Sequence, residues 1–111
     1  MNVKQAIRAF ASLAQETRLQ VFRILVEYGP EGIAAGALGK KLGIPHNTLS
    51  FHLSHLNAAG LVSWVKKGRS VIYRADLDMS QALGNFLLEN CCVATRPTCK
   101  TAQKLTKGCK C

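Results

Sequence analysis

The segment that most constrains the fold of this chain runs from Ile44 to Val62 and reads IPHNTLSFHLSHLNAAGLV. Leu49, Leu53 and Leu56 recur at positions i, i+4 and i+7, which is the spacing of one apolar face of an amphipathic helix. Gly60 predicts the end of that helix, and the apolar residues that follow it predict a strand. We expect the rest of the chain to present this helix.

The opposite face of the helix carries short polar side chains and imidazoles. Its members are His46, Asn47, Thr48, Ser50, His52 and His55. Such groups carry too little charge for a simply solvated face and are too polar for a core. They suit hydrogen bonding to base edges and phosphates in a DNA groove, so the sequence predicts double-stranded DNA as a partner.

Apolar spacing predicts three helices before this segment and one after it. The expected ranges are 3–14, a second helix that begins near residue 15 and ends at Gly29-Pro30, 35–42, and 76–90 with Asp76 or Asp78 as its cap. Glu31 to Ile33 is expected to be extended. The short connection from Gly43 to Pro45 has the length of a helix-turn-helix junction. Arg18 and Arg23 are expected to be solvated or in an intramolecular ion pair.

A hairpin is predicted where two β-rich runs, 62–65 and 71–75, flank a short turn that contains glycine. Lys66, Lys67 and Arg69 lie at its tip. A basic hairpin after a helix-turn-helix is placed to lie along the phosphate backbone, although an isolated charge run is more often merely solvated. The predicted fold class is therefore mainly α with a β-hairpin wing (α+β), a winged helix-turn-helix over residues 1–92.

The formal net charge of +9 favours an anionic partner, of which nucleic acid is the commonest. No apolar run reaches the ~18 residues of a membrane span, and no secretory signal opens the chain. We therefore expect a cytoplasmic protein with no membrane partner, in which thiols stay reduced. The first and last helices are apolar yet lie at the two ends of a small domain, which predicts a homodimer through these helices.

The block LSFHLSHLNAAGLVSWVKKGRSVIYRAD resembles the winged helix-turn-helix of ArsR/SmtB-type bacterial repressors. Those proteins share S-x-H-L-x-x-L-x-x-A/S-G-L-V and a basic G-x-x-x-x-Y wing. The upstream LAQETRLQVFRILVE resembles their second helix, so the resemblance covers residues 3–90. It implies a homodimeric repressor that leaves its operator when a metal or another inducer binds.

The resemblance also implies which side chains meet the major groove. Those positions are Asn47, Thr48, Ser50, Phe51 and His52. Phe51 departs from the family, in which a cation or polar residue is commoner there, and it can touch a thymine methyl group instead. Tyr73 at the end of the wing motif is expected to be a packing residue.

All five cysteines lie beyond residue 90, as Cys91, Cys92, Cys99, Cys109 and Cys111. An odd number in a reduced compartment indicates metal binding or redox chemistry rather than a disulfide framework. The helix-three and helix-five metal sites known in the family are not expected. Residues 33–38 hold no cysteine, histidine or carboxylate, and residues 79–111 hold no histidine.

Cys91, Cys92 and Cys99 are the predicted ligands of an inducer. All-thiolate coordination suits a soft ion, and trivalent arsenic or antimony takes three sulfurs without a nitrogen or oxygen ligand. Neighbouring side chains diverge by ~100° on a helix, so the vicinal pair is expected to meet where the last helix ends. The arrangement resembles the arsenic-responsive subset of the family with a C-terminal cysteine site, completed here by a cysteine- and lysine-rich tail over 93–111. No permanent cofactor is expected.

Other interpretations stay open at this level. The same cysteines suit a redox- or persulfide-sensing repressor, and in a constitutive DNA-architectural protein they would be incidental. A thiol enzyme is not expected, because it would want an oxyanion-binding loop or a C-x-x-C motif that the chain lacks. The choice among arsenite, antimonite and methylated arsenicals, and the role of Cys109 and Cys111, are also open, as is whether a site lies within one chain or bridges two.

Overall fold

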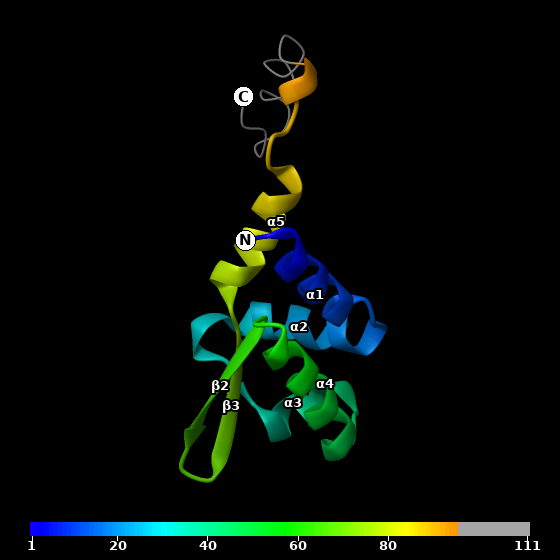
Figure 1. Cartoon of the computed structure of the whole chain (residues 1–111). Coiled ribbons are helices and arrows are strands. Elements are labelled where there is room, and N and C mark those ends of the chain that lie inside the picture. Colours follow the sequence, from blue (N-terminus) through cyan, green and yellow to red (C-terminus); the bar gives the residue numbers. More distant parts are fainter. Residues whose placement is uncertain (96–111) are drawn as a thin grey trace.

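The structure is a computed structural model that describes residues 1–95. In chain order its elements are α1 (Val3–Leu13), α2 (Glu16–Tyr28), the 3₁₀ turn η1 (Gly29–Glu31), β1 (Ile33–Ala34), α3 (Ala35–Leu42), α4 (His46–Ala58), β2 (Val62–Lys67), β3 (Ser70–Ala75), α5 (Leu77–Leu88) and the 3₁₀ turn η2 (Val93–Thr95). The predicted winged helix-turn-helix of mainly α class is confirmed (Figure 1). The division at residue 92 and the tail beyond it stay predictions.

The core forms around the leucine face of α4. Leu49, Leu53 and Leu56 are each at most 1% exposed, as the i, i+4, i+7 spacing predicts. They belong to one apolar cluster with Val21 and Leu25 of α2, both fully buried. Burial of each such side chain contributes about 1.5–3 kcal/mol, so this contact orients α4 more strongly than any polar interaction on its surface.

Side chains cap three of the helices. Asn2 and Gln5 form a reciprocal capping box at α1, and Gln15 accepts a hydrogen bond from the backbone N–H of Arg18 at α2. Asp76 Oδ1 accepts from the Met79 N–H at 3.0 Å, which confirms it as the cap of α5. These bonds satisfy N–H groups that the first helical turn leaves unpaired.

The last helix is shorter than predicted. The expected helix runs to residue 90, whereas α5 ends at Leu88. The C-cap Glu89 already leaves the helical conformation, with a ψ of 133°, and Asn90 follows with a φ of 63°, a left-handed conformation that asparagine tolerates better than most residues. Cys91 and Cys92 therefore lie beyond the helix, in the turn that follows it.

The wing is a three-stranded antiparallel sheet in the order β1-β3-β2. Trp64 pairs with Tyr73 and Lys67 with Ser70, so only Gly68 and Arg69 remain in the turn. Gly68 has a φ of 60°, as the first central residue of a type II′ turn requires. The strands thus extend further than the predicted runs 62–65 and 71–75, because both continue to a two-residue turn, and Lys66 and Lys67 belong to β2 rather than to the turn.

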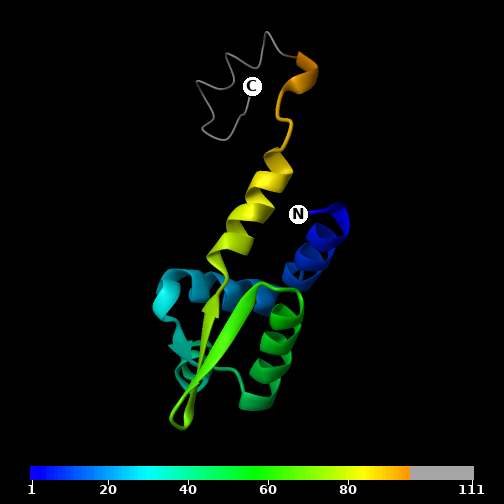
Figure 2. The same cartoon turned by 60° about the vertical axis from the view of Figure 1, so that its left-hand side comes forward.

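The two ends of the molecule differ: one holds the hairpin tip and the start of α4, and the other holds α1 and α5 with exposed apolar side chains. The hairpin tip and the N-terminal end of α4 lie at the same end in Figures 1 and 2, while α5 rises at the other end with α1 beside it. Val3 and Ile7 of α1 are each 60% exposed, and Leu87 of α5 is 67% exposed. In the part of the chain that the structure describes, no helix is long and apolar enough to cross a membrane.

Replacement of Gly32 by alanine tests how closely β1 approaches the wing. Gly32 has a φ of 72°, and a Cβ there would collide with the carbonyl oxygen of Tyr73 on β3. We expect Gly32→Ala to lower the free energy of unfolding by about 2 kcal/mol in urea denaturation. Gly36→Ala is the control, because a Cβ there meets nothing within 4 Å, and it should stabilise α3 by about 0.5–1 kcal/mol. Equal effects of the two changes would contradict the close approach.

Candidate nucleic-acid interface

The exposed side of α4 carries almost all the predicted DNA-contacting side chains of that helix. Its members are His46, Asn47, Thr48, Ser50, Phe51, Ser54 and His55. Ser54 was not among the predicted residues, although its i+4 spacing from Ser50 places it on the same face. No member carries a carboxylate, so the surface repels no phosphate. A helix with one side buried in leucine and the other short and polar can enter a major groove.

His52 is placed differently from the other predicted residues. Its side chain is only 8% exposed and lies at the edge of the buried face of α4. Its Nδ1 accepts a hydrogen bond from Nε of Arg18 on α2, at 3.2 Å. Arg18 is half-buried, and within residues 1–95 its polar partner is a neutral imidazole rather than a carboxylate, which the sequence did not predict. Arg23, five residues further along α2 and so about 140° around the helix from Arg18, is exposed as predicted.

Phe51 is the centre of a small aromatic cluster on the surface of α4. Its ring centroid lies 4.6 Å from that of His55 and 5.7 Å from that of His52, in edge-to-face geometry. The guanidinium carbon of Arg18 lies 5.7 Å from the same centroid. Although Phe51 is 56% exposed, its ring is contacted by three side chains.

The pKa of His52 is lowered from its usual value of 6.5. Burial is the largest cause, followed by the positive charges of Arg18 and His55. A ring whose Nδ1 accepts a hydrogen bond is neutral and carries its proton on Nε2. The contact between α2 and α4 thus depends on a histidine that stays uncharged.

The wing presents its cations to solvent. Lys66, Lys67 and Arg69 are all exposed, and none has an ion-pair partner among residues 1–95. Tyr73 is half-buried and packs on the core, which confirms the predicted packing role. Trp64, the only tryptophan of the chain, is 52% exposed on β2.

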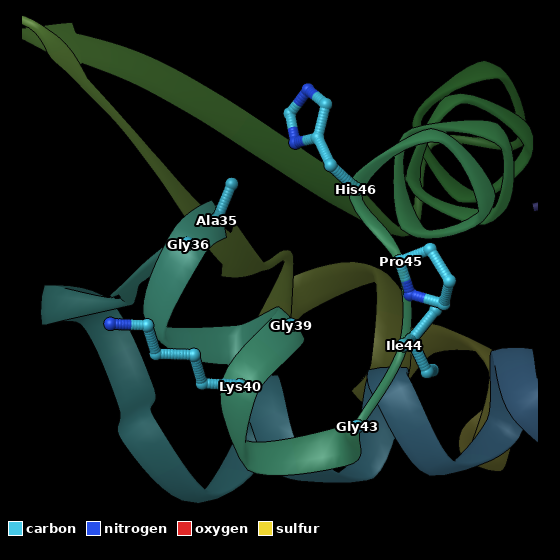
Figure 3. Close-up of a pocket in the computed structure, with 8 residues that line it drawn as sticks. All are labelled: Ala35, Gly36, Gly39, Lys40, Gly43, Ile44, Pro45 and His46. Carbon is cyan, nitrogen blue, oxygen red and sulfur yellow. The ribbon is translucent and has the colours of Figure 1, made fainter.

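A shallow cavity of about 360 Å³ lies at the helix-turn-helix junction (Figure 3). It is lined by Ala35, Gly36, Gly39, Lys40, Gly43, Ile44, Pro45 and His46. The Ile44 N–H donates to the carbonyl oxygen of Gly39 at 3.0 Å, which closes the turn tightly. Within residues 1–95 no three histidine, cysteine, aspartate or glutamate side chains are arranged to hold a metal ion.

The structure brings two of the three predicted inducer ligands together. Sγ of Cys91 and Sγ of Cys92 are 3.3 Å apart, a hydrogen-bond distance for thiols, and both residues are half-buried. Cys92 has a φ of 63°, so the pair does not diverge as it would on a helix. Cys99, Cys109 and Cys111 lie outside the described residues.

A helix-turn-helix family model and two bacterial proteins match much of the chain. A family model described as "Helix-turn-helix domain" matches residues 13–63. The uncharacterized HTH-type transcriptional regulator YceK of Bacillus subtilis (strain 168) is 37% identical over 75 residues, which are 63% of this chain and 74% of YceK. Nodulation protein NolR of Rhizobium meliloti is 35% identical over 68 residues. The match covers 61% of this chain but only 53% of NolR, about half of its length.

Solved structures share the fold. An ArsR-like transcriptional regulator from Rhodococcus sp. RHA1 superposes with a TM-score of 0.72 at 28% identity, over 90% of this chain and 92% of that one. The homodimeric winged helix-turn-helix DNA-binding domain of Mb0332 from Mycobacterium bovis, a possible ArsR-family transcriptional regulator, superposes with a TM-score of 0.65 at 25% identity over 78% of each chain. These neighbours and YceK are regulators rather than enzymes, which confirms that prediction.

The lowered pKa of His52 predicts that acid weakens the fold. In the unfolded chain His52 takes up a proton near pH 6.5, whereas in the folded protein it resists protonation. The stability is therefore fully present above pH ~6.5 and falls as the pH drops below it. Urea denaturation between pH ~7.5 and ~5 should give a steeper loss for the wild type than for His52→Gln. The same slope in both proteins would contradict this role of His52.

Proposed function

This chain belongs to the ArsR family of winged helix-turn-helix transcriptional regulators, and on that premise we propose that it is a homodimeric repressor with a thiolate inducer site. Trivalent arsenic or antimony, bound by Cys91, Cys92 and Cys99, releases it from its operator. The main support for a thiolate-bound inducer is the distance of 3.3 Å between the sulfur atoms of Cys91 and Cys92.

DNA recognition divides between two elements in this proposal. The exposed polar side of α4 meets base edges, with the N-terminal half of the helix deepest in the groove. The wing cations Lys66, Lys67 and Arg69 contact phosphates and set the register of the protein on the duplex. The unpaired state of these three cations within the described residues supports this division, since no carboxylate competes with phosphate.

Dimerisation is supported by the apolar surface at the other end of the molecule. Val3 and Ile7 are spaced i, i+4 on one side of α1, and Leu87 and Leu88 are exposed near the end of α5. Figure 2 shows α1 beside α5 at this end of the molecule. Exposed apolar groups on two adjacent helices favour a self-complementary interface. Mb0332, which has the same fold, is homodimeric. A dimer would place two α4 helices on half-sites ~34 Å apart.

The geometry of the vicinal thiols supports a three-coordinate soft ion. If an ion bonded both sulfurs at about 2.3 Å, the sulfur–ion–sulfur angle would be roughly 90°, because the two sulfurs are 3.3 Å apart. That angle suits a pyramidal ion with three ligands better than a tetrahedral one with four. Cys99 is the proposed third ligand, and its sequence separation from Cys92 is easily closed by the intervening chain.

The position of the thiols relative to α5 gives the proposed route from inducer to DNA. Cys91 follows the last residue of α5 closely, and its N–H donates to the carbonyl oxygen of Leu88 at 2.9 Å. An ion that draws Cys99 to this turn would rearrange the chain next to the exposed leucines of the proposed interface. A small change there alters the spacing of the two α4 helices, which is a coupling free energy between the two sites.

Metalloid titration of the reduced protein tests the inducer. We expect arsenite to lower operator affinity at least ~10-fold, about 1.4 kcal/mol of coupling, in fluorescence anisotropy. Cys91→Ser, Cys92→Ser and Cys99→Ser should each abolish the response while leaving metalloid-free DNA affinity unchanged. The Cys109→Ser/Cys111→Ser double variant is the control and should respond as the wild type does.

Two outcomes of that titration would contradict the proposal that trivalent arsenic or antimony is the inducer. Affinity that is unchanged by arsenite but falls on oxidation with diamide would assign the same thiols to redox sensing. Affinity that responds to neither reagent would leave a DNA-binding protein in which the cysteines have no sensory role.

Neutralisation of the wing tests the phosphate contacts. Each phosphate contact contributes about 0.9 to the slope of log affinity against log salt concentration. We expect the Lys66→Gln/Lys67→Gln/Arg69→Gln variant to lower the magnitude of that slope by about 2–3, on operator and unrelated DNA alike. Arg23→Gln removes an exposed cation of α2 outside the wing and should leave the slope unchanged. Equal slopes for both variants would exclude the wing from the DNA contact.

A further inference from the structure

Arg18 joins α2 to the exposed side of α4 although it lies in neither of the two helices that flank the turn, α3 and α4. Its Nε donates to His52 Nδ1 at 3.2 Å, while its guanidinium carbon lies 5.7 Å from the centroid of the Phe51 ring. It thus contacts two consecutive side chains of α4 from another helix. The side chain has no carboxylate partner within the described part of the chain, so these two contacts define its position.

These contacts restrict the Phe51 side chain although it is exposed. A phenylalanine on a helix surface ordinarily samples more than one χ1 rotamer, and ordering it on DNA binding costs free energy. Here Arg18 lies on the face of the ring, and His55 and His52 approach it edge-to-face. Three contacts hold the ring before any ligand arrives, which is pre-organisation of a binding surface.

We propose that Arg18 is a positioning residue for DNA recognition, which holds the Phe51 ring in the orientation that contacts a thymine methyl group in the major groove. This inference rests on the proposed function, because it takes the exposed side of α4 as the surface that reads DNA. Arg18 itself acts through Phe51 and His52. Phe51 offers an apolar edge, and the C5-methyl group of thymine is the apolar feature of that groove.

Only an arginine can make both contacts of residue 18. Its guanidinium is planar, so Nε donates in the plane while the face of the group covers an aromatic ring. A lysine keeps the positive charge but replaces the plane with a single ammonium group at the end of a flexible chain. Arg18→Lys therefore separates geometry from charge: a mere phosphate contact would survive the change, whereas the positioning of Phe51 would not.

Replacement of thymine by uracil gives a readout specific to this contact, since it removes the methyl group and nothing else. The operator is first selected from a random DNA pool with the full-length wild-type protein. Each thymine is then replaced singly, and affinity is measured by anisotropy. We expect at least one position at which uracil weakens wild-type binding roughly fourfold, the effect of one buried methyl group.

The variants are then compared at that position. Phe51→Ala should bind thymine and uracil duplexes equally, and Arg18→Lys should reduce the ratio from about fourfold to less than twofold. Arg18→Lys should keep wild-type affinity for unrelated DNA. Arg23→Lys is the matched control, the same change at an exposed arginine of α2 that has no hydrogen bond or ring contact with α4, and it should keep the full ratio. A merely structural role of Arg18 would lower affinity for both duplexes and leave their ratio intact.

A second measurement needs no DNA and covers the case in which a variant folds poorly. Three-bond couplings across χ1 of Phe51 should report one rotamer in the wild type and averaging in Arg18→Lys, with amide shifts in the leucine core of α4 unchanged. An undiminished uracil ratio, or a single Phe51 rotamer, in Arg18→Lys would overturn the inference while the proposed function stands. If the wild-type protein shows no preference for any DNA sequence, both the role of Arg18 and the proposed function are wrong.

Discussion

Burial of one leucine stripe decides the arrangement of the whole molecule. Leu49, Leu53 and Leu56 of α4 are almost completely removed from solvent against α2, and their removal costs far more than any change on the opposite side of the helix. When this stripe faces α2, the opposite face of α4 faces solvent, and the polar residues on it are exposed together. The wing follows within four residues of the end of α4, so the same contact also sets where its cations lie.

A polar contact between α2 and α4 lies at the edge of that stripe. His52 is buried but accepts a hydrogen bond from Arg18, so α2 both packs against α4 and orients side chains on its surface. The buried imidazole needs this partner, because an unsatisfied polar group at such a site would be costly. Packing and the proposed DNA-reading surface are therefore linked at one residue, and under the proposal a change in α2 alters DNA binding without altering any side chain that contacts DNA.

Periodicity predicts which segments are helices, but it does not predict where every helix ends or which contacts join distant segments. Residues 35–42 were predicted with the observed bounds, and the leucine face of α4 followed from spacing alone. The partner of Arg18 did not, because its bond to His52 spans 34 residues of sequence. The end of α5 was missed because Glu89 and Asn90 are both compatible with a helix in sequence, whereas the backbone is extended at Glu89 and left-handed at Asn90. The vicinal thiols were expected to meet beyond the helix, and they do, whereas Cys99 lies outside the described residues.

The central claim, that the exposed side of α4 reads the major groove, is tested most directly by methylation interference on duplexes selected from a random pool. Dimethyl sulfate methylates guanine N7 in the major groove and adenine N3 in the minor groove. We predict that N7 methylation within two half-sites, centred ~34 Å apart, excludes duplexes from the bound fraction. Interference at adenine N3 alone, or at no guanine within the selected sites, would contradict the placement of α4 in the groove.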